Sequence, residues 1–224
     1  MTAIAALPDI YNKYQTETIP VVIHGRRLQF IKPREIDSFI DPDDPLKGFP
    51  LWAKIWEASA VLAEYMAHLP PVAPPLQILE LGAGLGVAGI TAAAFGHRVT
   101  ITEYDPHALE FLRANALLNH CPDAAIHRLD WAQPDMEGQF DLIIGSEIVY
   151  SNPIIDLLTA VFQKYLHPQG RIVLAEGVRA TGVRFCERMA AGYDIRVRKT
   201  SLRCENEKRT ILLFEMSPKQ ASSP

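Results

Sequence analysis

The sequence predicts an α/β fold: a doubly wound, mostly parallel sheet of seven strands with an antiparallel last strand, plus an N-terminal β-hairpin extension. From Leu51 onward, short apolar strands alternate with stretches of helical spacing, which favours right-handed crossovers and helices on both faces. A glycine-rich turn follows the first of these strands. The last two strands have no helix between them, so they must pair antiparallel.

Composition limits the class of protein. A chain of 224 residues is long enough for one domain with a full core and a small extension. With 48% hydrophobic and 21% charged residues, the chain is globular and not disordered. The net charge of −4 produces no field that would draw the protein to nucleic acid or to an anionic membrane, so we expect neither as a partner.

Cysteines and histidines offer no obvious ligand pattern. Cys121, Cys186 and Cys204 are widely spaced and form no C-x-x-C motif, so we expect neither disulfides nor a metal site. The seven histidines also lack metal-ligand spacing. The first residues lack a basic segment followed by an apolar run, and no apolar stretch could span a bilayer. Together these features predict a protein of the reducing cytoplasm.

The first 49 residues are predicted to form a separate extension. Ile19–Ile23 and Leu28–Ile31 flank a turn that contains Gly25, which is typical of a β-hairpin. The proline- and aspartate-rich stretch DSFIDPDDPLKGFP then leads, as a loop, into a main domain over residues 50–216. The polar residues 217–224 are predicted to be a frayed tail.

Within the main domain, periodicity and the positions of proline and glycine define the expected elements. Phe140–Gly145 is continuously apolar, as a central parallel strand should be. The expected helices are Trp56–His68, Val87–Phe95, Pro106–Asn119, Ile154–Leu166 and Val183–Ala191. The expected strands are Leu76–Leu81, Val99–Thr102, Ala125–Leu129, Phe140–Gly145, Arg171–Ala175, Ile195–Arg198 and Thr210–Glu215.

The segment ILELGAGLG carries the strongest functional signal. A strand ends in Glu80, and Gly82, Gly84 and Gly86 then lead the chain into a helix. In an open α/β sheet, ligands bind beyond the carboxyl ends of the strands, where glycines allow close approach. The alternative is a tight turn between strand and helix without a ligand.

Two details of this loop argue against a dinucleotide. The third small residue of the G-x-G-x-x-G/A fingerprint is replaced by Val87. The carboxylate of Glu80 would repel a pyrophosphate and attract a cationic ligand. Glu103 ends the next strand, about 20 residues later, where an acid hydrogen-bonds the hydroxyl groups of a ribose. These residues predict a cationic ligand that carries a ribose.

The chain resembles class I S-adenosylmethionine methyltransferases, and more closely the seven-strand branch of small protein-lysine methyltransferases called methyltransferase family 16. The resemblance runs from about Pro50 to Met216. It implies transfer of a methyl group from S-adenosylmethionine to an amine nitrogen, with a protein lysine as the first expectation. The stretches that carry it are AKIWEASAVLAEYM, ILELGAGLGVAGI, HRVTITEYDPHALEFLRANALLN, LDW and FDLIIGSEIVY.

The resemblance also implies site residues by position. Glu103 stands where the family usually has a ribose-binding aspartate, and Asp130 with Trp131 matches a pair at the adenine. Glu147 and Tyr150 match a D/E-x-x-Y motif near the reacting methyl group. The implied cofactor-binding residues are Trp56, Glu80, Gly82, Ala83, Gly84, Gly86, Glu103, Asp130, Trp131 and Ser146, and the implied catalytic residues are Glu147 and Tyr150.

Several of these residues have simpler explanations. Trp131 could fill the core, and Trp52, one helical turn before Trp56, could be the real cofactor contact. Glu147 could be a capping acid and Tyr150 a half-buried tyrosine. Four cations could contact a substrate or be ordinary solvated charges, namely Lys54, Arg179, Arg184 and Arg203.

The expected mechanism requires alignment of the nucleophile, the methyl carbon and the sulfur. Glu147 would hold an amine by charge, Tyr150 would orient its nitrogen, and the proton could leave to water. A second hypothesis keeps this chemistry and changes the acceptor to a small amine or a heteroaromatic nitrogen. A third is a non-catalytic module that binds the cofactor and a partner.

Overall fold

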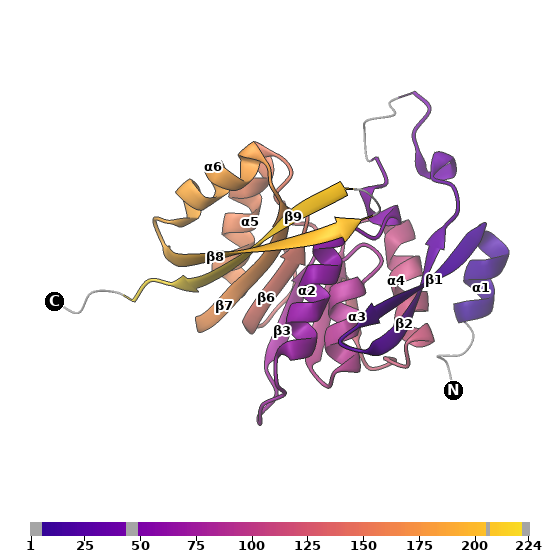
Figure 1. Cartoon of the computed structure of the whole chain (residues 1–224), viewed down its shortest axis with the longest axis horizontal. Helices are drawn as coiled ribbons and strands as arrows, with labels where there is room; N and C mark the ends of the chain where they lie inside the picture. The colour runs from indigo at the N-terminus through magenta and orange to yellow at the C-terminus, as the bar shows by residue number, and fades with distance from the viewer. Residues whose placement is uncertain (1–5, 44–48, 205–206, 221–224) are drawn as a thin grey trace.

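The computed structural model describes residues 6–43, 49–204 and 207–220. Its centre is a seven-stranded sheet, and a two-stranded sheet lies beside it (Figure 1). The large sheet contains β3 (Gln77–Leu81), β4 (Arg98–Glu103), β5 (Ala125–Arg128), β6 (Phe140–Ser146), β7 (Leu166–Gly177), β8 (Tyr193–Cys204) and β9 (Glu207–Pro218). The small sheet is formed by β1 (Thr16–Ile23) and β2 (Arg26–Pro33).

Helices accompany the strands in the expected alternation. The helices are α1 (Ala6–Lys13), α2 (Glu57–His68), α3 (Val87–Ala94), α4 (Pro106–Leu118), α5 (Asn152–Tyr165) and α6 (Ala180–Met189). Two short 3₁₀ turns cover Asp37–Phe39 and Leu51–Ala53. Among the described residues, no helix is both long and apolar enough to cross a bilayer.

The order of the large sheet is β5-β4-β3-β6-β7-β9-β8. The first five strands of this order run parallel, whereas β9 pairs antiparallel with both β7 and β8. The predicted fold class, including the antiparallel last strand, is therefore confirmed. The chain builds outward from β3 through β4 to β5 and then returns to the other side of β3, which makes the carboxyl ends of β3 and β6 a topological switch point.

Alternation along the strands divides the interior into two cores. Ile78 packs in a cluster with α2, α3 and α4, whereas Leu79 packs in a second cluster with α5 and α6. Ile144 and Ile143 divide in the same way on β6. Successive side chains of a strand point to opposite faces, so a continuously apolar strand supplies both cores.

The hairpin of β1 and β2 docks on α4 through side-chain amides. The Asn115 side chain accepts a hydrogen bond from the Ile31 amide (2.6 Å) and donates to the carbonyls of Ile31 (3.1 Å) and Leu85 (3.0 Å). One turn later, the Asn119 side chain exchanges a similar pair of bonds with the backbone of Gln29. Two asparagines thus satisfy the backbone groups of a strand edge that has no neighbouring strand.

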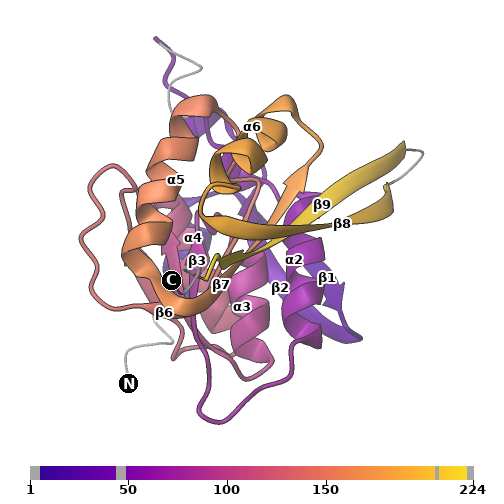
Figure 2. The same cartoon turned by 90° about the vertical axis from the view of Figure 1, so that its left-hand side faces the viewer.

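The sequence predicted too little regular structure in the N-terminal extension and at the end of the sheet. It did not predict α1, because a helix of only 8 residues is too short to be stable alone. Lys13 of α1 pairs with Glu110 of α4 at 2.7 Å, which helps to hold this helix in place. Strands β8 and β9 are longer than predicted, because their charged side chains interrupt the apolar pattern. They form a hairpin that extends past the rest of the sheet (Figure 2). Because β9 runs to Pro218, the predicted tail is wrong for residues 217 and 218, and residues 221–224 lie outside the described chain.

Replacement of Asn115 by alanine should destabilise the fold by about 2–4 kcal/mol, because it leaves buried backbone groups of Ile31 and Leu85 without partners. Urea unfolding followed by circular dichroism measures the loss. Asn12→Ala, on the exposed face of α1, is the control and should stay within about 0.5 kcal/mol of the parent. Equal stabilities of the two variants would show that the amides do not anchor the hairpin.

Candidate functional site

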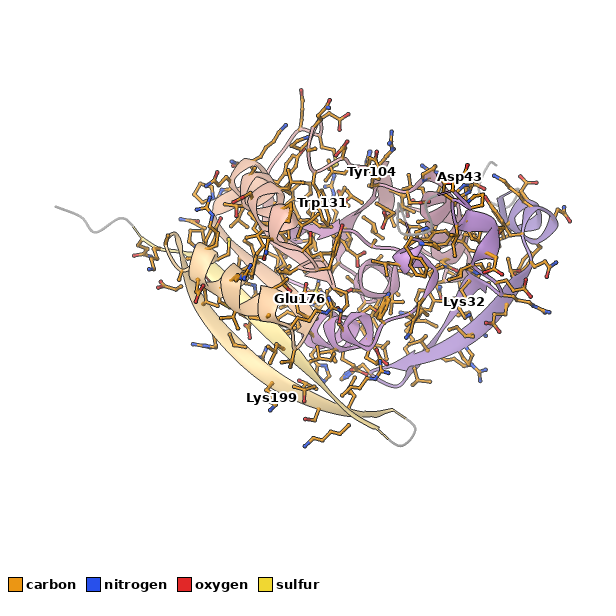
Figure 3. The ribbon with its side chains drawn as sticks, turned by 90° about the horizontal axis from the view of Figure 1, so that it is seen from above. Lys32, Asp43, Tyr104, Trp131, Glu176 and Lys199 are labelled. Carbon is orange, nitrogen blue, oxygen red and sulfur yellow. The ribbon has the colours of Figure 1, made fainter. Side chains whose placement is uncertain are left out.

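A cavity of about 370 Å³ opens at the switch point, in the volume range of small-molecule sites. Its walls come from the loop after β3, the ends of β4, β5 and β6, and the segment that leads into α2. Figure 3 shows Trp131 and Tyr104, two of its lining residues, along the same edge of the molecule. Ten of the predicted site residues line the cavity: Trp56, Gly82, Ala83, Gly84, Glu103, Asp130, Trp131, Ser146, Glu147 and Tyr150.

Each of the three glycines of the loop allows a different neighbouring residue to pack closely against the backbone. All have left-handed backbone, with φ of +61° at Gly82, +55° at Gly84 and +84° at Gly86. A side chain at Gly82 would lie 3.2 Å from the Trp131 ring, and one at Gly84 would lie 3.3 Å from the Trp52 carbonyl. A side chain at Gly86 would lie 2.2 Å from Leu112 of α4. Gly86, at the N-cap of α3, is therefore a packing residue against α4 and, contrary to expectation, is not among the residues that line the cavity.

Glu80 also lies outside the cavity lining. Its position on β3 directs it to the same face as Ile78, and its side chain is only 2% exposed beneath α3. The carboxylate accepts a hydrogen bond from the Gly89 amide (3.0 Å), and burial raises its pKa to about 8. The sequence placed Glu80 among the residues that face the ligand, whereas in the structure its carboxyl group is turned under α3 and anchors the first turns of that helix.

Glu103 is the acid that does reach the cavity. One carboxylate oxygen accepts from the Gly84 amide (2.8 Å), and the other accepts from the amides of Tyr104 (2.6 Å) and Asp105 (3.1 Å). Burial raises the pKa of Glu103 above its usual value, although the donated amides act in the opposite direction. Asp105 also lines the cavity, but its carboxylate caps α4 by accepting from His107 (2.7 Å) and Ala108 (3.0 Å).

Indole rings contribute to two walls. Trp131 packs against Gly82, and its neighbour Asp130 accepts a hydrogen bond from the Ala132 amide (2.8 Å). Trp52 and Trp56 both line the cavity. The Trp52 indole nitrogen is buried without a hydrogen-bond partner, whereas that of Trp56 donates to the Leu51 carbonyl (2.8 Å). The two tryptophans considered as alternatives therefore both contribute to the cavity wall, and they differ in whether the indole nitrogen has a partner.

The predicted acceptor residues lie after β6, but Glu147 is already engaged. Its backbone has φ of +56°, one carboxylate oxygen accepts from the Gly177 amide (3.0 Å), and the other forms an ion pair with Arg179. Tyr150 lines the cavity with 48% of its surface exposed. Burial, and to a smaller extent the negative charge of Glu103, raises its pKa above the ordinary value.

Sequence reasoning missed Glu176, which lies inside the molecule near the end of β7 (Figure 3). It is 2% exposed, and one carboxylate oxygen accepts from the amides of Ile148 (2.9 Å) and Val149 (3.2 Å). Burial, followed by the nearby charge of Glu147, raises its pKa to about 8. In the sequence, this residue is marked only by being a single acid at the end of an apolar run. Glu176 therefore holds the backbone between Glu147 and Tyr150.

The four cations named as possible substrate contacts are separated by the fold. Lys54 lines the cavity, and its ammonium lies 4.5 Å from the centre of the Trp56 ring. Arg179 is bound to Glu147, and Arg184 is exposed on α6 away from the cavity lining. The side chain of Arg203 lies outside the described part of the chain.

Comparison with known proteins identifies the family. A family model described as lysine methyltransferase matches residues 50–190. The chain belongs to this lysine methyltransferase family. The chain is 36% identical to mouse EEF1A lysine methyltransferase 3 over 57% of this chain and 56% of the relative. It is 39% identical to mouse protein N-lysine methyltransferase METTL21A over 47% of this chain and 52% of that relative.

A solved structure of similar fold is the SAM-dependent methyltransferase from Agrobacterium tumefaciens, with a TM-score of 0.61 and 17% identity over 90% of this chain and 70% of that one. Fold and family membership together make S-adenosylmethionine the cofactor of this protein. The chain spans about half the length of the curated relatives that it matches.

The buried Glu80 predicts a pH-dependent stability. Below pH 4.5 the carboxyl group is protonated in the folded and the unfolded chain; between pH 4.5 and about 8 the unfolded chain loses the proton and the folded chain keeps it. Stability should therefore fall as pH rises through this window. Relative to the parent, Glu80→Gln should gain roughly 1 kcal/mol per pH unit in unfolding free energy.

Urea unfolding of Glu80→Gln and parent at pH 5, 6 and 7 tests this expectation, and the contribution of Glu176 cancels because both proteins retain it. Glu35→Gln, at an exposed position, should follow the parent at every pH. A constant difference between Glu80→Gln and the parent across the window would contradict a raised pKa for Glu80.

Proposed function

We propose that this protein transfers a methyl group from S-adenosylmethionine to the side-chain nitrogen of a lysine in a protein substrate. The main support is the cavity at the switch point, which combines a ribose-type acid, an indole wall and the E-x-x-Y segment in a chain of the lysine methyltransferase family. We propose a cytoplasmic site of action, in keeping with the free thiols of Cys121 and Cys186.

The residues that line the cavity suit the parts of this cofactor. The Glu103 carboxylate would accept hydrogen bonds from the ribose hydroxyls, and the Trp131 indole with Asp130 would hold the adenine. The left-handed backbone at Gly82 and Gly84 would let the chain approach the remainder of the molecule closely. The bound cofactor supplies a methyl group on a positively charged sulfur, and the protein supplies orientation and exclusion of water.

The acceptor amine would enter beside Glu147 and Tyr150. Because Arg179 already neutralises Glu147, a protonated lysine would have to compete with the guanidinium for this carboxylate. The pair as a whole has no net charge, so it accommodates the neutral amine that reacts. The Tyr150 hydroxyl would orient the nitrogen, and the proton would leave to water.

The rim of the cavity favours a protein substrate over a small amine. Phe49, Leu51, Tyr104 and Tyr150 line the cavity and still expose large apolar side chains to solvent. Clustered exposed apolar and aromatic side chains are typical of surfaces that bind other proteins. The net charge of −4 also favours protein over nucleic acid as the partner.

Incubation with methyl-labelled cofactor and host lysate distinguishes the proposal from its alternatives. A labelled protein band with label on lysine is expected. A labelled small molecule would identify a small-amine methyltransferase, and absence of any label despite cofactor binding would identify a non-catalytic module.

Glu103→Gln should weaken binding of S-adenosylhomocysteine by roughly 1–3 kcal/mol, because the variant loses a charged acceptor for the ribose hydroxyls. Isothermal calorimetry measures the change. The control is Asp105→Asn, which keeps the oxygen that caps α4 and should bind nearly as well as the parent. If Asp105→Asn lost the affinity and Glu103→Gln kept it, the ribose acid would be Asp105.

Glu147→Gln and Tyr150→Phe should keep cofactor affinity and lose turnover, because their contacts are made mainly with the acceptor and the transition state. Tyr150→Phe should lose on the order of tenfold in rate for a hydrogen bond worth about 1.4 kcal/mol. Glu147→Gln should lose more, because it also releases Arg179. The single-turnover rate of methyl transfer and a separate cofactor titration, measured for each variant, distinguish a loss of turnover from a loss of cofactor affinity. Normal turnover in both variants would show that the methyl acceptor binds at another place.

A further inference from the structure

We propose that His24, Glu64 and His68 form a binding site for a transition-metal dication of the Zn²⁺ type. None of the three lines the cofactor cavity. His24 lies in the turn between β1 and β2, and Glu64 and His68 lie one helical turn apart on α2. The proposal is independent of methyl transfer and concerns how the N-terminal hairpin is attached to the main domain.

The donor atoms are already close together. One ligand atom from each residue lies within 4.8 Å of the others. In a tetrahedral zinc site with bonds of about 2.0–2.2 Å, donor atoms are about 3.3 Å apart. Both histidines are exposed, so their rings can rotate by the small amount that closure requires. The ring centres of His24 and His68 are 4.3 Å apart, with the rings edge to face.

Hydrogen bonds orient the carboxylate and one imidazole in advance. One Glu64 oxygen accepts from the His24 amide (2.9 Å), and the other lies 3.7 Å from His68 Nδ1. His68 Nδ1 also lies 2.7 Å from the Glu64 backbone carbonyl. If Nδ1 donates its proton to that carbonyl, the lone pair of the ring is placed on Nε2, as in many zinc sites where the second ring nitrogen bonds a carbonyl.

The chemistry of the ligands selects the class of metal. Two imidazoles and one carboxylate suit Zn²⁺ and its neighbours Ni²⁺ and Cu²⁺, whereas Mg²⁺ and Ca²⁺ prefer oxygen ligands. The remaining coordination positions would hold water, because the side chains supply three ligands. Arg26, two residues after His24, is turned toward Phe95 and bonds the Ala94 carbonyl, so its charge is partly compensated there.

A metal at this site would join the turn of the hairpin to α2. This helix begins at Glu57, directly after the cavity-lining Trp56. Because a metal bound only by the folded chain stabilises that chain by mass action, the melting temperature should rise with metal concentration.

The test is calorimetric titration of Zn²⁺ into the full chain without an affinity tag, after chelator treatment, together with thermal melts. We expect one metal per chain and a higher melting temperature. His24→Asn tolerates the left-handed backbone of the turn (φ of 47°) and removes an imidazole, and His68→Gln removes the other. Each should weaken Zn²⁺ binding by roughly tenfold or more, and His127→Ala, an exposed histidine of β5, should bind like the parent.

The proposal is overturned if the parent gives no heat above a protein-free blank, or if His24→Asn and His68→Gln bind Zn²⁺ like the parent. Substitution with Co²⁺ provides a second measurement, because a thiolate ligand gives an intense charge-transfer band that nitrogen and oxygen ligands lack. A thiolate band would assign the metal to cysteine and contradict the site proposed. Neither result bears on methyl transfer, which is measured separately.

Discussion

The hydrogen bond from the Gly84 amide to the Glu103 carboxylate ties the loop after β3 to the end of β4, and both of these segments line the cavity. It depends on the left-handed backbone of the glycine loop, which only glycine adopts readily. The same loop admits Trp131 against Gly82 and the backbone of Trp52 against Gly84. An added side chain at either glycine would push a wall of the cavity outward, so the shape of the site follows from these few positions.

Carboxylates that bond backbone amides recur along this edge of the sheet, with different tasks. Glu80 anchors α3, Glu103 ties the glycine loop to β4, and Glu176 holds the segment after β6. Each of these side chains supplies a hydrogen-bond acceptor to a backbone amide near the place where a strand ends and a helix or loop begins. Burial raises the pKa of all three. Of these three, Glu103 is the one that lines the cavity, and it is the one proposed to contact the ligand.

The proposed acceptor side of the cavity is built from β6 and β7 together. Glu147 follows β6, but its amide bonds the Ala175 carbonyl of β7 and its carboxylate bonds Gly177 and Arg179. Glu176 of β7 in turn bonds the residues that follow Glu147. The placement of Tyr150 at the cavity therefore depends on the pairing of these strands as well as on the local E-x-x-Y spacing.

The sequence alone determined the alternation of strands and helices, the glycine loop and the cavity edge, because periodic burial and turn chemistry are local properties. It placed Glu103 at the edge where the cavity lies, yet it did not determine that Glu80 turns under α3 or that Glu147 meets Arg179. It also showed no metal-ligand spacing, although folding brings His24 to Glu64 and His68. These contacts join residues far apart in the chain, and only the packing of elements in three dimensions decides which distant side chains become neighbours.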